Sequence, residues 1–433
     1  MTTKNFLKAV LPSMLSQMLN GFFIIVDGFF IGGAMGDSGL AAINIAWPIA
    51  AVIMSTGMGL GTGGAVLTAI ARGEGDSKTA AKVRGNTLLA LTAASVLLMG
   101  IFWFTYPTLL PLMGAVDNLY PLAASYIQVI ILFAAVQVFS SGLLPLLRGN
   151  GKPVAAMAVM IQGLLMNIFL DWLLVWKLNW GMFGAAAATL LAQFSGVPVA
   201  LVLLLGNRDI PLHASDFLPC KNLLRKMVVL GASPFGLSVS VSAVILLNNV
   251  QALHYGGANA VAVYAILSYV FGSLHPLLSG VGEGSQPLIS YCHGAKDRTG
   301  MRFVRKAAFY MVLCVAAVLA AGAWLTRYQA GLLFGAGPQA AEGAAQGMLW
   351  YCLCLPFFGI ARICSSYFCA TAQSRMANLL AFAEPLLVQP VCLVVLPMFF
   401  GVQGIWAAAF AAYFLLAVAG LAMLYRELQV QPD

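Results

Sequence analysis

The stretch VLPSMLSQMLNGFFIIVDGFFI, residues 10–31, decides how the rest of the sequence must be read. It is long enough to cross the apolar core of a bilayer, which takes roughly 20 residues of α-helix. It carries Pro12 and Asp27, and no small-residue cleavage site follows a short apolar core. We therefore interpret it as the first transmembrane helix and not as a removed signal peptide.

Apolar runs of this length recur along nearly all of the 433 residues, of which 61% are hydrophobic and only 8% charged. Such a composition lies far outside that of a soluble globular protein. The runs predict twelve spans in an all-α membrane protein with no separate soluble domain. We place the spans at about 10–31, 45–70, 87–106, 122–146, 157–176, 184–205, 228–253, 263–290, 307–325, 347–370, 379–399 and 404–424.

The basic residues set the predicted orientation of these spans. All but three of the 22 lysine and arginine residues fall in alternate loops, the exceptions being Lys177, Arg327 and Arg362. The positive-inside rule then places both termini in the cytoplasm. We expect a monomer that crosses the bacterial cytoplasmic (inner) membrane several times and has the lipid bilayer as a partner. No continuous basic face points to nucleic acid, and the eight cysteines show no disulfide or metal-ligand spacing.

The two halves of the sequence resemble each other. Sliding one half along the other aligns the glycine-rich run that begins at Gly57 with the run that begins at Gly280, and Asp76 with Asp297. The same alignment places Asp27 on Asn249. We predict two pseudo-symmetric six-helix bundles around a central cavity: an N-terminal lobe (1–205), a cytoplasmic linker (206–227) and a C-terminal lobe (228–433). Such repeats commonly rock to expose one site alternately to each side of the membrane.

Several motifs carry a resemblance to a known family. They are Asn167-x-x-x-Asp171 followed by Gly181-x-x-Gly184-Ala-Ala, and Gly282-x-Gly284-x-Gln286-Pro287-Leu288-Ile289. With them the chain resembles, over essentially its whole length, the multidrug and toxic compound extrusion (MATE) family. Acids in helices one and five are similar to the DinF-like branch of that family, whereas the NorM-like branch keeps acids in helices seven and ten.

The resemblance implies a secondary active multidrug efflux transporter, not an enzyme, that exports amphiphilic cationic or aromatic drugs by alternating access. It implies xenobiotic export and antibiotic resistance, driven by proton antiport or alternatively by Na⁺. No cofactor is implied beyond the coupling ion, H⁺ or Na⁺.

Four acids lie at membrane depth: Asp27, Asp171, Glu283 and Glu384. A buried carboxylate is costly unless it is protonated, paired or bound to a cation, which suits it to ion exchange. The candidate cation-coupling residues are Asp27, Asn167, Asp171, Asn20 and Thr189. The alternative is that these polar groups only join helices through hydrogen bonds.

The other polar residues within spans are assigned as follows. Candidates for the substrate cavity are Gln17, Gln193, Asn248, Asn249 and Gln286. Glu283, Arg362 and Glu384 form either a buried ion pair or triad, or a cytoplasmic gate or substrate contact. Pro12 either starts helix one or, as the resemblance implies, lets it bend.

Two rival functions remain open at this point. A flippase for a lipid-linked sugar or other amphiphile of the same superfamily would need a cavity rich in basic residues, yet only Arg362 lies within a span. A membrane-embedded enzyme would need clustered catalytic or metal-binding residues, and the four histidines have no such spacing. We therefore assign no catalytic and no metal-binding residue.

Overall fold

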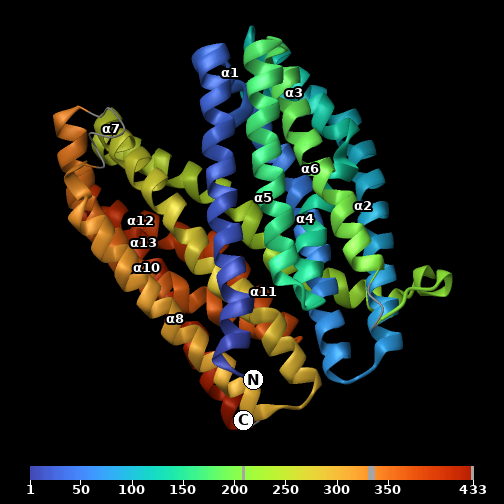
Figure 1. Ribbon diagram of the computed structural model, residues 1–433. Coiled ribbons are helices and arrows are strands. Elements are labelled where there is room, and N and C mark those ends of the chain that lie inside the picture. Colours follow the sequence, from blue (N-terminus) through green and yellow to red (C-terminus); the bar gives the residue numbers. More distant parts are fainter. Residues whose placement is uncertain (207–209, 330–336, 431–433) are drawn as a thin grey trace. The chain divides into compact units, whose positions relative to one another are not determined.

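The computed structural model describes residues 1–206, 210–329 and 337–430, and these form helices joined by short turns and loops (Figure 1). The apolar runs form helices because a backbone in lipid must satisfy its own hydrogen bonds within the segment. The first half of the chain forms α1 (Thr3–Gly73), α2 (Ser77–Leu112), α3 (Leu119–Leu132), α4 (Ala134–Gly149), α5 (Pro153–Leu170), the π-helix η1 (Asp171–Lys177) and α6 (Gly181–Leu205).

The second half repeats this order. A short 3₁₀ helix, η2 (Ala214–Phe217), leads into α7 (Lys221–Gly294). There follow α8 (Arg298–Leu325), α10 (Pro338–Ala370), α11 (Ser374–Ala383), the π-helix η3 (Glu384–Val388), α12 (Gln389–Phe400) and α13 (Val402–Val430).

Two long helices each contain a break that separates two membrane spans. Gly36 in α1 has φ 62° and Gly257 in α7 has φ 63°, a region of backbone conformation that favours glycine. Among the described residues, ten helices are long and apolar enough to cross a membrane, or eleven if α3 and α4, bent by 63° at their junction, together count as one span. Counting the parts of α7 before and after Gly257 as separate spans then brings the number to twelve.

The internal repeat is also visible in the backbone. Asp76 and Asp297 cap α2 and α8 with nearly the same φ and ψ, and each accepts a hydrogen bond from the backbone three residues on. Gly181, the first residue of α6, and Gly401, which directly precedes α13, have φ of 57° and 56°. Matching conformations at aligned positions indicate that the two halves fold as copies of one unit.

The helices divide into two compact units. One consists of residues 1–18, 240–293 and 297–433, and the other of residues 19–239 and 294–296. The division falls inside α1 and α7, so each of these helices contributes to both units. The lobes 1–205 and 228–433, with the linker 206–227, remain a prediction.

Glycines in both units allow helices to approach closely. A Cβ atom at Gly59 of α1 would lie 2.7 Å from the backbone oxygen of Gly231 in α7. In the other unit, a Cβ atom at Gly280 would lie 2.6 Å from the Cα atom of Met14. The glycine-rich runs are therefore helix-packing surfaces.

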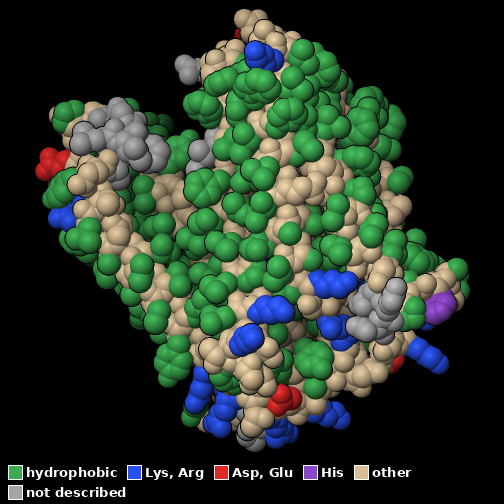
Figure 2. Space-filling model, in the orientation of Figure 1, with side chains coloured by type: hydrophobic (Ala, Val, Ile, Leu, Met, Phe, Trp, Pro, Cys, Tyr) green, Lys and Arg blue, Asp and Glu red, His purple; other side chains and the backbone are tan. Residues whose placement is uncertain are grey.

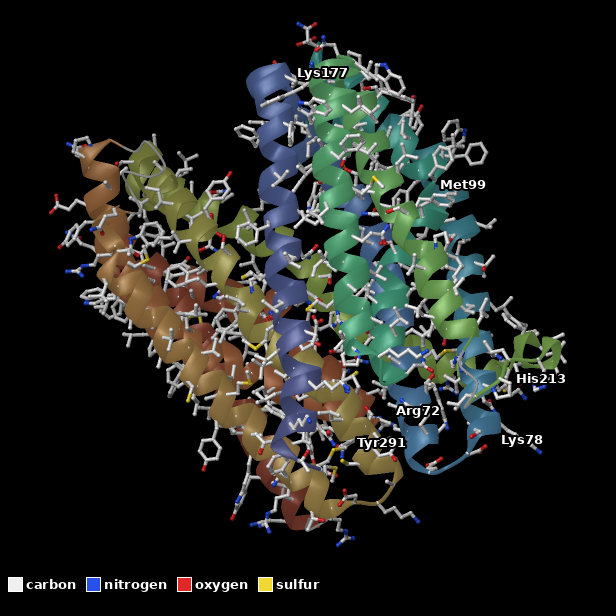
Figure 3. All side chains as sticks on the ribbon, viewed as in Figure 1. Arg72, Lys78, Met99, Lys177, His213 and Tyr291 are labelled. Atoms are coloured by element: carbon white, nitrogen blue, oxygen red, sulfur yellow. The ribbon has the colours of Figure 1, made fainter. Side chains whose placement is uncertain are left out.

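Charged side chains mark the ends of the helices. Figure 2 shows hydrophobic side chains over most of the visible face, with lysine and arginine gathered toward one end of the helices. Within the unit 19–239, Lys177 lies at the opposite end from Arg72 and Lys78 (Figure 3). In the other unit, the start of α1 and the end of α13 lie at the same end (Figure 1).

The segment between α6 and α7 is held by two buried residues at the start of α2. The Arg84 guanidinium donates hydrogen bonds to the backbone oxygens of Leu204 and Ile210. The Asn86 amide, fully buried, donates to the backbone oxygens of Asp216 and Leu218 and accepts from the backbone N–H of Cys220. The backbone that leads into α7 is therefore fixed by side chains from another helix.

Candidate functional site

Polar side chains from four parts of the unit 19–239 meet beside one of its apolar cores. Asp27 comes from α1, Thr189 from α6, Tyr126 from α3, and Asn167 and Asp171 from the junction of α5 with η1. Tyr126 belongs to that core, with Val175 and Leu190 next to it along η1 and α6. The polar cluster therefore lies inside the helix bundle and not at its lipid-facing surface.

Asp171 is the most deeply buried acid of the described chain. Its exposure is 0%, and among the described residues no hydrogen bond of normal geometry reaches either carboxylate oxygen, although the Asn167 side chain lies close enough to act on it. Asn167, one helical turn earlier, is also 0% exposed with both side-chain amide atoms unpartnered. A buried carboxylate in this state is expensive as an anion, so the site favours uptake of a cation.

The π-helix begins at Asp171 itself. Single turns of π-helix inside α-helices often occur at functional sites, because the widened turn changes where side chains point. Further along η1, the Trp176 Nε1 atom donates to the backbone oxygen of Phe30 at 3.1 Å, and its ring packs edge-on against the Phe30 ring. This contact ties η1 to α1 three residues beyond Asp27.

Asp27 is half-buried and lies next to Thr189. The Thr189 hydroxyl donates to Asp27 Oδ1 over a long 3.5 Å. Asp27 and Asp171 are near enough for each charge to act on the other, and both act on Tyr126. Two carboxylates in one apolar site repel each other as anions, so a proton or metal cation would stabilise the pair.

Tyr126 is the residue that sequence reasoning missed. It is 3% exposed and brings a hydroxyl group to the cluster from α3. A tyrosine in an apolar run is usually packing, and no spacing in the sequence sets Tyr126 apart. Only the fold packs α3 against α6 and so brings Tyr126 within electrostatic reach of both acids.

Two expected members of the N-terminal set lie elsewhere. Asn20 is exposed, and the structure does not bring it into the cluster. Gln193 is half-buried one turn beyond Thr189, with its side-chain oxygen buried and unpartnered. Gln193 can therefore offer an acceptor to a ligand.

The acids of the other unit are partnered by side chains. Arg362 Nη2 lies 3.2 Å from Glu384 Oε1, which also accepts a 2.8 Å hydrogen bond from the Tyr413 hydroxyl. Glu283 instead accepts a hydrogen bond from the Gln17 side chain. The structure thus shows an Arg362–Glu384 ion pair, one of the predicted alternatives, and a hydrogen bond that links α1 to α7 at Glu283.

The remaining candidates show no common site. Asn248 is buried and donates to the backbone oxygen of Val244, while Asn249 is half-buried. Gln286 lies against Cys369. Pro12 is buried in the interior of α1, which begins at Thr3, so Pro12 does not start the helix. Among the described residues no group of three or more His, Cys, Asp or Glu could hold a metal ion.

Twelve membrane helices in two repeats, with acids buried at membrane depth, define a membrane transport protein. The chain belongs to the MatE family, whose family profile matches residues 12–173 and 235–394. That match covers both halves of the repeat.

Curated relatives span almost the whole chain. The multidrug export protein MepA of Staphylococcus saprophyticus is 25% identical over 417 residues, covering 96% of this chain and 91% of the relative. MepA of Staphylococcus aureus (strain NCTC 8325) is 24% identical over 421 residues, covering 96% and 92%. These relatives are transporters and not enzymes, as is this chain.

Solved structures share the fold. An outward-facing multidrug resistance MATE family transporter superposes with a TM-score of 0.93, at 21% identity over 99% of this chain and 96% of that chain. A transporter of the MOP superfamily from Pyrococcus furiosus gives the same TM-score, identity and coverage. The all-helical, twelve-span fold and the family resemblance are thereby confirmed.

Proposed function

We propose that this chain is a multidrug efflux transporter that exports amphiphilic cationic drugs in exchange for a small cation, H⁺ or Na⁺, taken up at Asp27 and Asp171. The observation that carries the proposal is the fully buried Asp171 carboxylate, which has only the neutral Asn167 amide and a second acid, Asp27, acting on it among the described residues. The MepA relatives, named as multidrug export proteins, support the substrate class.

The chemistry follows from the cost of burying charge. With both acids ionised, the site is unfavourable until a cation enters. A proton neutralises one carboxylate directly. A sodium ion would be held by oxygens, which the Asn167 amide and the Thr189 and Tyr126 hydroxyls can supply beside the two acids. Either ion removes the repulsion and favours closer packing of α1 against α6 and η1.

Exchange then requires that the loaded and empty sites favour different conformations. We propose that the two predicted lobes, 1–205 and 228–433, rearrange around a shared drug cavity, with both termini in the cytoplasm of a bacterial cell. A ligand shifts such an equilibrium only by its difference in affinity for the two states. Cation uptake removes the repulsion between the two carboxylates, and this change supplies the difference in affinity between the two conformations.

The test is ethidium efflux from cells that express matched amounts of Asp27→Asn, Asp171→Asn and, as a control, Glu342→Gln. Glu342 is an exposed acid of α10. The two aspartate variants should lose at least roughly tenfold in initial efflux rate, because an amide cannot take up a proton or replace the charge. Glu342→Gln should transport like the parent chain.

The coupling ion is then identified in vesicles. Proton and sodium gradients are imposed in turn, and the gradient that drives ethidium transport by the parent chain identifies the coupling ion. Unchanged efflux in both aspartate variants would refute the coupling site. The flippase alternative is disfavoured by Arg362, the one basic residue assigned to a span, because its guanidinium is paired with Glu384.

A further inference from the structure

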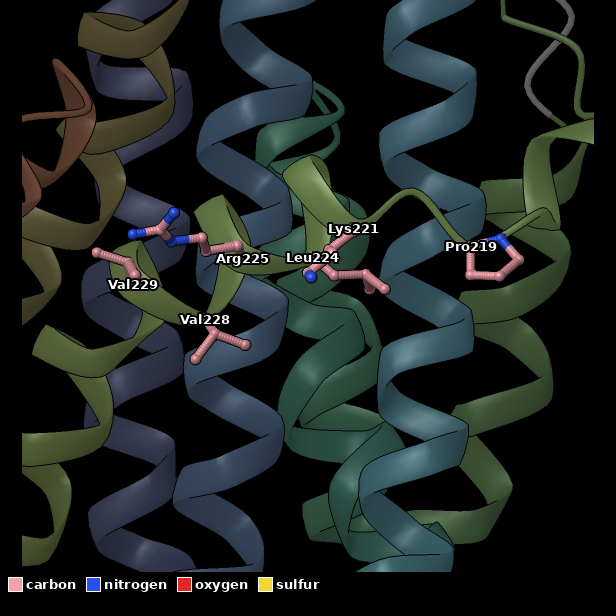
Figure 4. Close-up of a pocket in the computed structure, with 6 residues that line it drawn as sticks. All are labelled: Pro219, Lys221, Leu224, Arg225, Val228 and Val229. Carbon is pink, nitrogen blue, oxygen red and sulfur yellow. The ribbon is translucent and has the colours of Figure 1, made fainter.

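A groove of about 420 Å³ lies where the segment after α6 enters α7 (Figure 4). It is lined by Pro219, Lys221, Leu224, Arg225, Val228 and Val229. All six belong to the unit 19–239 and are separate from the acidic cluster. None of them has a role in the proposed transport chemistry.

The chemistry of the groove is that of an anionic amphiphile. Lys221 and Arg225 are exposed and four residues apart, so they lie on one face of α7. Among the described residues, neither makes an ion pair or a side-chain hydrogen bond, and no acid lines the groove. Two free cations at one rim attract a phosphate group and repel a cationic drug.

The floor of the groove is apolar. Val228 is 56% exposed and Val229 39%, one turn further along α7 than Arg225, with Leu224 beside them. A soluble anion would gain nothing from this surface. An acyl chain would cover it, at about 0.8 kcal/mol for each buried CH₂ group.

The rim is held in place before any ligand binds. Asn86 of α2 accepts a 2.8 Å hydrogen bond from the backbone N–H of Cys220 and donates to the backbone oxygen of Leu218 at 3.1 Å. These bonds fix the backbone on both sides of Pro219, two positions before Lys221. A preformed site loses less conformational entropy on binding.

We propose that this groove binds an anionic phospholipid, with the phosphate between Lys221 and Arg225 and an acyl chain on Val228 and Val229. The site lies where basic residues meet the apolar surface of a membrane protein, the setting in which lysine and arginine recognise anionic headgroups. The lipid would brace the entry into α7.

Native mass spectrometry of the detergent-purified full chain tests this site, with phosphatidylglycerol and phosphatidylcholine as probes. The parent chain should retain phosphatidylglycerol in preference to phosphatidylcholine. The Lys221→Gln/Arg225→Gln variant should bind phosphatidylglycerol roughly 25-fold more weakly, since each basic residue near an anionic surface contributes about fivefold. The charge-preserving Lys221→Arg/Arg225→Lys variant should retain the lipid.

A matched control removes an equivalent pair elsewhere. Arg302 and Lys306 of α8 are exposed, four residues apart, and outside the groove. Arg302→Gln/Lys306→Gln should leave lipid retention unchanged. Equal losses in the two glutamine variants would overturn the proposal. So would competition by glycerol phosphate at the concentration at which phosphatidylglycerol binds, which would indicate a site for free phosphate.

Discussion

At the scale of single residues, the Arg362–Glu384 pair shows how this chain keeps charge inside the membrane. The two side chains are 15% and 9% exposed, and the Tyr413 hydroxyl bonds to the same carboxylate oxygen. The Arg362 guanidinium also lies 4.8 Å from the centre of the Phe358 ring. Such a pair offsets its own desolvation only while both partners remain.

We therefore expect Arg362→Met alone to lower the free energy of unfolding by about 3 kcal/mol, because it leaves the Glu384 charge buried without its arginine partner. The double variant Arg362→Met/Glu384→Leu should recover most of that loss, since both charges are gone. SDS-induced unfolding of the purified protein measures the difference. A double variant less stable than the single one would show that the pair contributes net stability.

The candidate site could be predicted from the sequence only in part. The cost of an acid in a span identified Asp27 and Asp171, and helical spacing placed Asn167 with Asp171. Spacing within one helix does not reveal which helices touch, so Tyr126 was missed. For the same reason Asn20 was included although it is exposed. The hydrogen bond from Gln17 to Glu283 was not predicted for the same reason.

At the scale of elements, the repeated caps of α2 and α8 make a prediction with a defined pH dependence. Hydrogen bonds from Thr79 hold the pKa of the Asp76 carboxyl below its usual range, and those from Gly300 and Thr299 do the same for Asp297. A lowered pKa in the folded state means that the cap stabilises above the unfolded pKa, about 3.9. That contribution is lost as the pH falls through the folded value.

Asp76→Ala should therefore speed hydrogen exchange in the first turn of α2 about fivefold at pH 7, equivalent to ~1 kcal/mol for a lost cap. Below the folded pKa the parent chain and the variant should converge, after correction for intrinsic exchange. Asp76→Asn should keep the protection at every pH, because an amide oxygen also caps. Equal exchange in the parent chain and Asp76→Ala at pH 7 would contradict the role of the cap.

The spans themselves were predictable because hydrophobic length is a property of the sequence. The breaks within the spans were harder to predict from the sequence. The bend between α3 and α4 and the π-helices at Asp171 and Glu384 depend on packing against neighbouring helices. Pro12 illustrates the limit: a proline near the start of an apolar run suggests a helix start, yet α1 begins at Thr3.

At the scale of the whole molecule, the two halves share one fold but differ in how their buried acids are partnered. Asp27 aligns with Asn249, so the copies share a backbone but not a charge. In the second half the acid Glu384 has an arginine partner, whereas Asp171 has none among the described residues. Duplication of one fold followed by divergence of its buried charges accounts for an acid pair in the first half, where we propose cation exchange, and an arginine–glutamate pair in the second.

The membrane orientation of this duplicated fold is the last prediction. Lys177 lies at the end of its unit opposite Arg72 and Lys78 (Figure 3), and the positive-inside rule assigns the basic end to the cytoplasm. In intact cells, a membrane-impermeant maleimide should label Lys177→Cys but not Lys78→Cys, which should react only after permeabilisation. The parent chain serves as the control for background labelling of the native cysteines, including the partly exposed Cys220. Labelling of Lys78→Cys from outside would show that the topology is opposite to the predicted one, and that the coupling ion enters from the other side.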